Sequence, residues 1–442
     1  MPEDLYLKPC VLILIASYAS GFLLPGVIGR AFMRKLFMNK HLFLWLMVLA
    51  WGVGCSPKAA LYRQNSAFRY AADRTFYYDL RREGDSLHVY LKLTDPSMYK
   101  SPASRLSYLV NLSYERDEII KRDSIPDFAS RLQVFGDFGF AHFKIPLAGI
   151  PLPAVIQLQV HRGPAAAADG PWLDIPLNRE SVAKNFILAD STQKLPLFRD
   201  YIHTQEAFYF QALPPATQLQ IKRYESDFPA ALPPFSSGKK NVPPVLSLLE
   251  TWQTDGQDSI HLPEPGLYQL ASGSSGAALM VAEFPFPNLT TARDLIEPLI
   301  YLTSAKEREA LYKAEVPKLA LDRFWLDVAG QNKDRARQLI KAYYGRVKRA
   351  NQFFSSHKAG WLTDRGMIYI IFGEPDVVNR RQQGEEWVYQ RPRTSGRDIK
   401  FIFNKKPNTF TQNHYEVDRR LEYEFLWYST VEKWRKGIIL EN

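Results

Sequence analysis

Between residues 62 and 172, hydrophobic and polar positions alternate along short runs of β-branched and aromatic residues. The clearest runs are Thr75–Tyr78, Leu87–Leu93, Tyr108–Leu112 and Val155–Val160. Turn residues such as Arg82–Asp85 separate the runs at the spacing of hairpins. A period of two places every second side chain on the same face of a strand. We therefore expect an antiparallel β-sandwich, the first module, over residues 55–182.

A second region with strand-like runs covers about residues 185–285. It is interrupted by the proline-rich connections Leu213–Pro215, Leu232–Pro234 and Val242–Pro244. Proline has no amide hydrogen to donate to a sheet, so these segments are expected in loops or at edges. The run Glu264–Leu270, followed by Ala278–Ala282, predicts a hairpin. We expect a second, small β-sandwich over residues 183–288.

From Leu289 the hydrophobic period becomes that of a helix. Thr290 or Thr291 can cap a first helix, and the segment Thr303–Glu307 has the form of a second cap. Residues 332–354 carry apolar side chains on one broad face and Lys and Arg on the other. Such a stripe is typical of a helix that packs on a core. A helical segment is therefore predicted over residues 289–357.

The last segment, residues 358–442, combines strands with a terminal helix around Tyr428–Arg435. The predicted strands are Met367–Phe372, Glu386–Tyr389, Ile399–Phe403 and Tyr415–Val417. Antiparallel strands packed on the preceding helix form a small α+β domain. The predicted fold class is thus multidomain β plus α+β: two antiparallel β-sandwich modules followed by a helical segment and a small α+β domain.

Two apolar stretches lie within residues 1–54. Pro9–Ile28 is uncharged and about long enough to span a bilayer. The second stretch starts at Met33 with basic residues, continues through an apolar run to Trp51 and ends in small residues before Cys55. This order is that of an export signal. With its cysteine, it resembles a bacterial lipoprotein signal, although Gly52 stands where leucine is commoner.

The lipoprotein resemblance implies that cleavage makes Cys55 the acylated first residue, which would attach the protein to a lipid bilayer. Translation would then start at Met33 or Met38. The alternative keeps both stretches as membrane helices around the basic loop Arg30–Lys40, and it also exports the large domain. In the Bacteroidota-type lipoproteins that this signal resembles, acids after the cysteine favour surface display. Their absence here favours the periplasmic face of the outer membrane.

Composition narrows the function classes. The 442 residues exceed what one hydrophobic core usually holds, which is roughly 250–300 residues. The net charge of +10 is spread over interleaved acids and bases, so we do not expect nucleic-acid binding. Both cysteines, Cys10 and Cys55, lie in or beside the apolar N-terminus, and the eight histidines lack metal-ligand spacing. We expect no metal and no cofactor.

An acid and a base stand side by side at Asp364 and Arg365, and a second acid follows at Asp376. Glycosidase chemistry needs two carboxyl groups across a cleft. Sequence adjacency, as in Glu385–Glu386, does not supply this, because neighbouring strand residues point to opposite faces. The chain also lacks the nucleophile-elbow, phosphate-loop and zinc-protease motifs. We expect no catalytic residues and no enzyme.

Backbone geometry offers another interpretation of this stretch. Gly360 suits the left-handed cap of the long helix, and Gly366 and Gly373 permit positive φ on either side of the predicted strand. Arg365 is expected to pair with Asp364, Glu374 or Asp376, which leaves the charges either locking a turn or contacting a partner. The residues singled out as motif positions and possible partner contacts are Gly360, Trp361, Thr363, Asp364, Arg365, Gly366, Gly373, Pro375, Asp376 and Trp387.

The segment Gly360–Gly366, followed by Tyr369–Asp376, closely resembles the signature of the GWxTD-domain proteins, exported lipoproteins best known from Bacteroidota. Arg323–Trp325, Tyr343–Val347, Ala350–Phe354 and Glu386–Tyr389 fit the same pattern. The resemblance covers about residues 290–430, with Glu374 as a minor departure. It implies a domain of unassigned function.

Four serines, Ser86, Ser124, Ser191 and Ser259, follow an aspartate in the acceptor pattern of Bacteroidota O-glycosylation. The same pairs are also ordinary turn chemistry. Taken together, the sequence favours a non-enzymatic outer-membrane lipoprotein that binds an envelope protein. The alternative is a glycan-binding or glycan-processing envelope protein.

Overall fold

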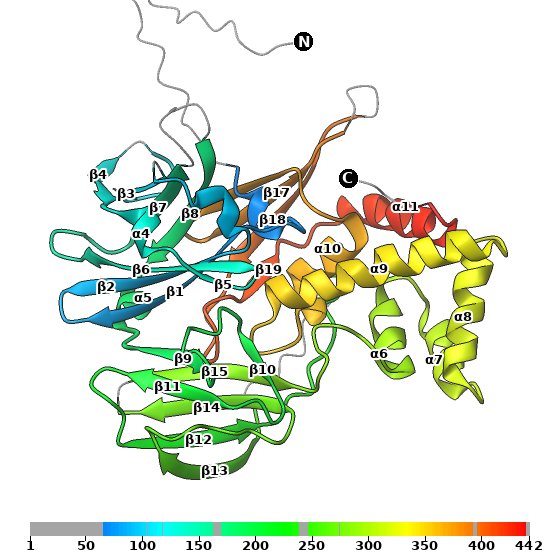
Figure 1. The fold of residues 1–442 in the computed structure, drawn as a ribbon. Helices are drawn as coiled ribbons and strands as arrows, with labels where there is room; N and C mark the ends of the chain where they lie inside the picture. The colour runs from blue at the N-terminus through cyan, green and yellow to red at the C-terminus, as the bar shows by residue number, and fades with distance from the viewer. Residues whose placement is uncertain are drawn as a thin grey trace, which may run out of the picture. The chain divides into compact units, whose positions relative to one another are not determined.

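The computed structural model describes residues 65–438 except 103, 117, 162–168, 238–245, 274 and 392–395. Cys55 and both apolar stretches lie outside the described residues, so export and lipidation stay predictions. The described residues belong to one compact unit, Tyr62–Asn442, whose elements are drawn in Figure 1. Within this part of the chain, none of the helices combines the length and apolarity that a bilayer span requires.

The first module is the predicted antiparallel sandwich. Its two four-stranded sheets have the orders β1-β2-β6-β5 and β4-β3-β7-β8. The strands are β1 (Phe76–Glu83), β2 (Ser86–Leu93), β3 (Arg105–Asn111), β4 (Ile119–Ile125), β5 (Gln133–Phe135), β6 (Phe138–Pro146), β7 (Ala154–His161) and β8 (Asp169–Leu177). Short helices η1 (Ala67–Tyr70), η2 (Pro96–Tyr99), α4 (Phe128–Arg131) and α5 (Arg179–Ala183) flank them. Both sheets contribute to one core, with Leu91, Val110 and Ile156 fully buried.

The second module contains a five-stranded sheet in the order β10-β15-β14-β12-β13 and the separate pair β11-β9. Its strands are β9 (Phe186–Asp190), β10 (Tyr201–His203), β11 (Phe208–Ala212), β12 (Gln218–Tyr224), β13 (Leu248–Asp255), β14 (Gly266–Ser272) and β15 (Ser275–Ala282). The pairs are antiparallel except β10 with β15, which is parallel. Phe208, Leu219 and Leu270 join both sheets in one core.

Hydrophobic contacts connect the two β modules. Tyr90 and Phe140 of the first module form a buried cluster with Ile187 and Ala189 of β9. Because burial of apolar surface is the main favourable term in packing, this cluster fixes β9 against the first sandwich.

The predicted helices follow in order. They are α6 (Ala292–Ile296), η3 (Glu297–Tyr301), α7 (Ala305–Lys313), α8 (Pro317–Val328) and α9 (Lys333–Phe354). Thr291 and Ser304 begin α6 and α7 with the capping boxes that the sequence indicated. Helix α9 turns Leu339, Tyr343 and Val347 into the core. Figure 1 shows α9 running beside α10.

The predicted strand Met367–Phe372 is wrong, because these residues belong to helix α10 (Asp364–Phe372). A continuous apolar run fits a buried helix as well as a buried strand. Here Met367 to Ile371 are all fully buried, so the helix is covered on every side. Thr363 caps its start and Gly373, at φ +91°, ends it.

The C-terminal sheet has the antiparallel order β16-β17-β18-β19. Its first strand in this order, β16, comes from residues to which the sequence analysis assigned no strand. The elements are η4 (Gly360–Leu362), β16 (Val377–Arg381), β17 (Gly384–Tyr389), β18 (Ile399–Lys405), β19 (Tyr415–Val417) and α11 (Tyr423–Arg435). One core joins this sheet to α8, α9 and α10, so it crosses the domain boundary expected at 357/358. Tyr70, from the start of the described chain, lies in that same core.

Candidate functional site

The two glycines that open the motif allow three backbone segments to touch. A Cβ on Gly360 would lie 1.9 Å from the carbonyl oxygen of Ala350 in α9. A Cβ on Gly366 would lie 1.9 Å from the carbonyl oxygen of Gly360. Neither glycine has positive φ, so the expected left-handed cap at Gly360 and the positive φ at Gly366 are wrong. The glycines instead permit α9, η4 and α10 to pack backbone against backbone.

Thr363 and Asp364 hold the start of α10. The Thr363 hydroxyl donates to the Gly360 carbonyl at 2.7 Å and accepts from the Gly366 amide at 3.0 Å. Asp364 accepts from the Val417 amide at 2.8 Å and forms a two-pronged ion pair with Arg419. An acid in the first turn also suits the helix dipole. These hydrogen bonds cap a helix and attach β19, so they do not close a turn.

Arg365 forms the centre of a second buried network. Its Nη1 donates to Glu385 Oε1 at 2.7 Å, and its Nη2 donates to the carbonyl and side-chain oxygens of Asn413. Tyr70 and Trp387 also donate to Glu385. The Arg365 guanidinium lies over the Tyr415 ring, 4.0 Å from its centroid. The expected pairing of Arg365 with Asp364, Glu374 or Asp376 is therefore wrong.

Electrostatics shows that this pair is charged in the folded protein. Burial acts to raise the pKa of the Glu385 carboxyl, but the positive charges of Arg365 and Arg380 outweigh it and leave the pKa lowered. Burial acts to lower the pKa of Arg365, but Tyr70 and Glu385 outweigh it and leave the pKa raised. Asp364, Arg365 and Glu385 are each 3% exposed. Side chains this deeply buried cannot contact a partner directly, which corrects that expectation for Asp364 and Arg365.

The remaining motif residues lie around the hydrogen-bond networks of Asp364 and Arg365. Trp387 is fully buried, with its ring 5.1 Å from that of Tyr70. Trp361 is half-buried, and its amide donates to Asn351. Pro375 is buried, whereas Asp376 is exposed and accepts from the Gln390 amide. Of the motif positions, Asp376 alone keeps an exposed charge.

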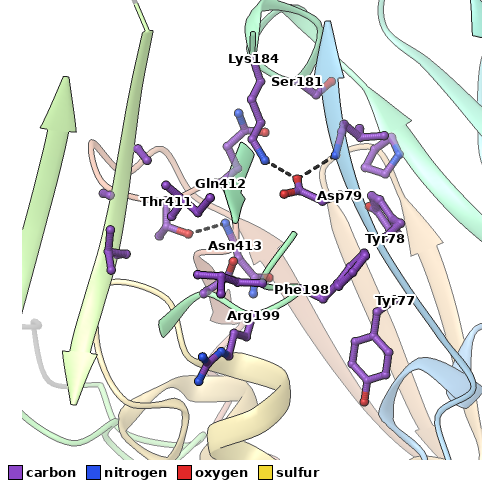
Figure 2. Close-up of a pocket in the computed structure, with 18 of the residues that line it drawn as sticks. Tyr77, Tyr78, Asp79, Ser181, Lys184, Phe198, Arg199, Thr411, Gln412 and Asn413 are labelled. Carbon is purple, nitrogen blue, oxygen red and sulfur yellow. Dashed lines mark hydrogen bonds and ion pairs between the residues drawn. The ribbon is translucent and has the colours of Figure 1, made fainter. Parts of the chain in front are cut away.

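A cavity of about 690 Å³ lies beside the Arg365 network. It is lined by β1, β15, residues 184–200 and residues 410–415. Figure 2 shows Tyr77, Tyr78 and Asp79 on one wall and Thr411, Gln412 and Asn413 on another. Arg365 is part of the lining. The network of the motif therefore supports one wall of the cavity.

The lining holds seven Arg or Lys side chains but three carboxylates, so the cavity is positively charged. Four of these cations have carboxylate partners: Lys184 pairs with Asp79, Arg199 with Glu206, Arg365 with Glu385 and Arg380 with Asp174. Asp200 keeps water-accessible surface, yet the surrounding protein raises the pKa of its carboxyl through burial. The remaining cations are Arg69, Arg74 and Lys405.

Sequence reasoning missed Tyr70, Asn413 and Arg419 because each joins the motif from a distant part of the chain. Glu385 could have been found. Alternation in a strand places it on the same face as Trp387, a large aromatic residue of the kind that usually lies in a core. A carboxylate on a buried strand face requires a cation, and Arg365 was the nearest candidate in the motif.

Of the four serines of the glycosylation pattern, Ser86 lies in β2 and Ser124 in β4, whereas Ser191 and Ser259 lie in the connections that follow β9 and β13. Ser124, Ser191 and Ser259 are exposed, and Ser86 is half-buried at the start of β2. Exposure makes modification of the first three sterically feasible. Among the described residues, no cluster of three or more His, Cys, Asp or Glu side chains is arranged to hold a metal ion.

These features define a protein with β-sandwich modules and an α+β domain whose motif organises buried contacts. Residues 266–436 match the family model of the GWxTD domain. The chain is therefore a GWxTD-domain-containing protein. The match starts at β14, earlier in the chain than the sequence motifs indicated. A comparison with curated proteins found no match.

Proposed function

We propose that this protein is a non-enzymatic lipoprotein of the outer membrane that binds a partner protein in an envelope assembly. Acylated Cys55 would attach it to the bilayer at the periplasmic face. The signal-like segment before Cys55 supports the anchor. The buried motif supports a structural role for the α+β domain, because its carboxylates are engaged by protein groups.

The observation that carries the partner-binding proposal is an exposed apolar stripe at the start of α11. Leu421, Phe425 and Tyr428 are 73%, 79% and 56% exposed. Phe425 and Tyr428 are three residues apart on α11 and lie on one side of the helix, and Leu421 lies two residues before the helix begins. Large exposed apolar side chains grouped in this way mark interaction sites more often than inert surface. We define Leu421, Phe425 and Tyr428 as the α11 stripe.

A photo-crosslinking amino acid at Phe425 tests this proposal in intact cells. The expected result is one discrete adduct in the membrane fraction, which disappears when Tyr428 is also changed to Glu. The control position is Tyr312 on α7, which is an aromatic residue 40% exposed on another helix. Equal adduct patterns from both positions, or none from either, would refute docking at the α11 stripe.

The anchor requires a separate measurement. Cys55→Ser should leave the chain unprocessed before residue 55 and remove the acyl mass from the mature protein. Mass spectrometry of the membrane-extracted protein checks both. A wild-type chain that starts upstream of Cys55 and carries no acyl group would overturn the lipid anchor.

Glycan binding is the second candidate function, and the cavity is the observation that favours it. Its volume lies within the roughly 300–1,000 Å³ typical of small-ligand sites. The lining combines aromatic rings with hydroxyl and amide groups, which are suited to binding a glycan.

A further inference from the structure

The cavity has a side that carries positive charge without acidic partners. Arg69 and Arg74 both line it. The Nε of Arg74 donates to the Phe76 carbonyl at 2.9 Å, and its guanidinium lies 4.2 Å from the centroid of the Tyr77 ring. Arg69 reaches the Asp174 carbonyl at 3.4 Å. Among the described residues, neither guanidinium forms an ion pair with a carboxylate.

On the same side of the cavity, one arginine has a hydrogen-bond donor without a partner in the described part of the chain. The Nε of Arg69 is buried and has no hydrogen-bond partner among the described residues. The buried Nε atoms of Arg365 and Arg419 also lack partners among these residues, so the ligand argument rests on the terminal groups of the guanidinium side chains. Guanidinium groups bind carboxylates and phosphates through two parallel hydrogen bonds. Two such groups in one cavity match an anionic group on a ligand.

The pKa of Arg74 agrees with the close placement of the two arginines in the cavity. Burial, followed by the positive charge of Arg69, lowers the pKa of Arg74 to about 10. Two like charges that repel in a low-dielectric site attract an anion that would neutralise them.

The other lining groups are neutral and suit a hydroxylated ligand. Thr411 and Gln412 supply a hydroxyl and an amide group, and Figure 2 shows them around the same space as Tyr77 and Phe198. The hydroxyl of Ser181, which also lines the cavity, is engaged by the backbone of Asn178. Amides and hydroxyls both donate and accept, as the hydroxyl groups of a sugar do. Aromatic rings offer flat apolar surfaces for the apolar face of a sugar ring.

We propose that this cavity binds an acidic saccharide, with its carboxylate held by Arg69 and Arg74 and its hydroxyl groups met by Thr411 and Gln412. The assignment deepens the second candidate function, glycan binding, and is independent of the α11 stripe. Loss of crosslinking at Phe425 would therefore leave it standing, and loss of sugar binding would leave the partner-binding proposal standing.

Isothermal titration of the full chain in detergent tests the assignment with four probes. Trigalacturonate is acidic and hydroxylated, maltotriose is neutral, triglutamate is acidic without a sugar ring, and inorganic phosphate is a simple anion. We expect trigalacturonate to bind at least about tenfold more tightly than each of the others, the scale of one charge-assisted contact. Equal or tighter binding of maltotriose, triglutamate or phosphate would overturn the saccharide assignment, as would no binding of trigalacturonate.

Matched variants place the binding in the cavity. Arg74→Gln should weaken trigalacturonate binding about tenfold or more, and Arg337→Gln should leave it unchanged. Arg337 loses the same charge from an exposed site on α9, where its side chain is 77% exposed. Equal weakening by both variants would show that the overall charge attracts the sugar and would overturn the site.

Two further variants keep the test decisive if Arg74→Gln does not fold, as judged by circular dichroism. Lys405→Gln removes a half-buried lining cation and should weaken trigalacturonate binding. Asp200→Asn removes a lining carboxyl group and should not weaken it. The reverse pattern would contradict an anion site in this cavity.

Discussion

Arg365 and Arg74 line the same cavity but stand in opposite electrostatic environments. Arg365 meets the Glu385 carboxylate at 2.7 Å, and the pKa of its guanidinium is raised. Arg74 meets a carbonyl and a ring, and the pKa of its guanidinium is lowered. Charge at the motif is therefore paired with a carboxylate within the fold, whereas the charge of Arg74 forms no ion pair with a carboxylate among the described residues. A structural site and a binding site can thus share one wall.

The largest expected effect comes from changing Gly360, which lets the backbone of the motif pack against α9. Gly360→Ala places a Cβ 1.9 Å from the Ala350 carbonyl oxygen, and neither backbone can yield without moving a helix. We expect a loss of about 3 kcal/mol or more in the free energy of unfolding. Denaturant unfolding measures it.

Gly345→Ala is the matched control for that change. This glycine lies in α9, and the nearest atom to an added Cβ is the flexible end of Arg349 at 3.8 Å. Since alanine favours helices, we expect the control to be neutral or more stable by up to about 1 kcal/mol. Equal losses at both positions would show that close backbone packing is not the reason for Gly360.

The second effect concerns the motif charges themselves. Glu385→Gln leaves Arg365 buried beside a neutral group, and removing one member of a buried ion pair costs about 3–5 kcal/mol. The neighbouring change Glu386→Gln breaks a contact with Arg381, whose side chain is 46% exposed, and should cost less than about 1 kcal/mol. Similar losses from the two variants would contradict a special role for the Arg365 pair.

The same pair predicts a dependence of stability on pH. The pKa of Glu385 is lower in the folded protein than the ordinary value of 4.5. A lowered carboxyl pKa contributes stability above about pH 4.5, and this contribution is lost as pH falls through the folded value. The stability difference between wild type and Glu385→Gln should therefore shrink from pH 7 toward pH 3. Unfolding curves at both pH values measure it, and a constant difference would argue against an ionised Glu385.

Much of the fold could be predicted from the sequence, because the hydrophobic residues repeat with a clear period along the strands and helices. Alternation predicted β1, β2, β3 and β7, and helical spacing predicted α9, which Asn332 caps in the structure. The failure at α10 has a physical cause. A run of six apolar residues buried on all sides carries no amphipathic period, so the Thr363 cap and the Gly373 terminus were the usable signals.

The candidate site was less predictable than the fold. Arg365 was singled out, but its partners Tyr70, Glu385 and Asn413 lie 295, 20 and 48 residues away. The cavity cations Arg69 and Arg74 belong to no motif, since they reach the site only because η1 packs against the C-terminal core. Long-range packing of this kind leaves no local pattern in the sequence.

The smallest expected effect on stability concerns Arg74, the cavity arginine of the comparison. The folded state lowers the pKa of Arg74 to about 10, which means that folding disfavours its charged form below that pH. Arg74→Gln should therefore change the free energy of unfolding by less than about 1 kcal/mol at pH 7, with any change toward greater stability. Arg365→Gln, measured beside it, should lose about 3 kcal/mol, because Glu385 then stays buried without its cation. If Arg74→Gln loses as much as Arg365→Gln, Arg74 is a structural residue and the contrast between the two guanidinium groups fails. If it keeps its stability and loses trigalacturonate binding, the uncompensated charge near β1 serves a ligand.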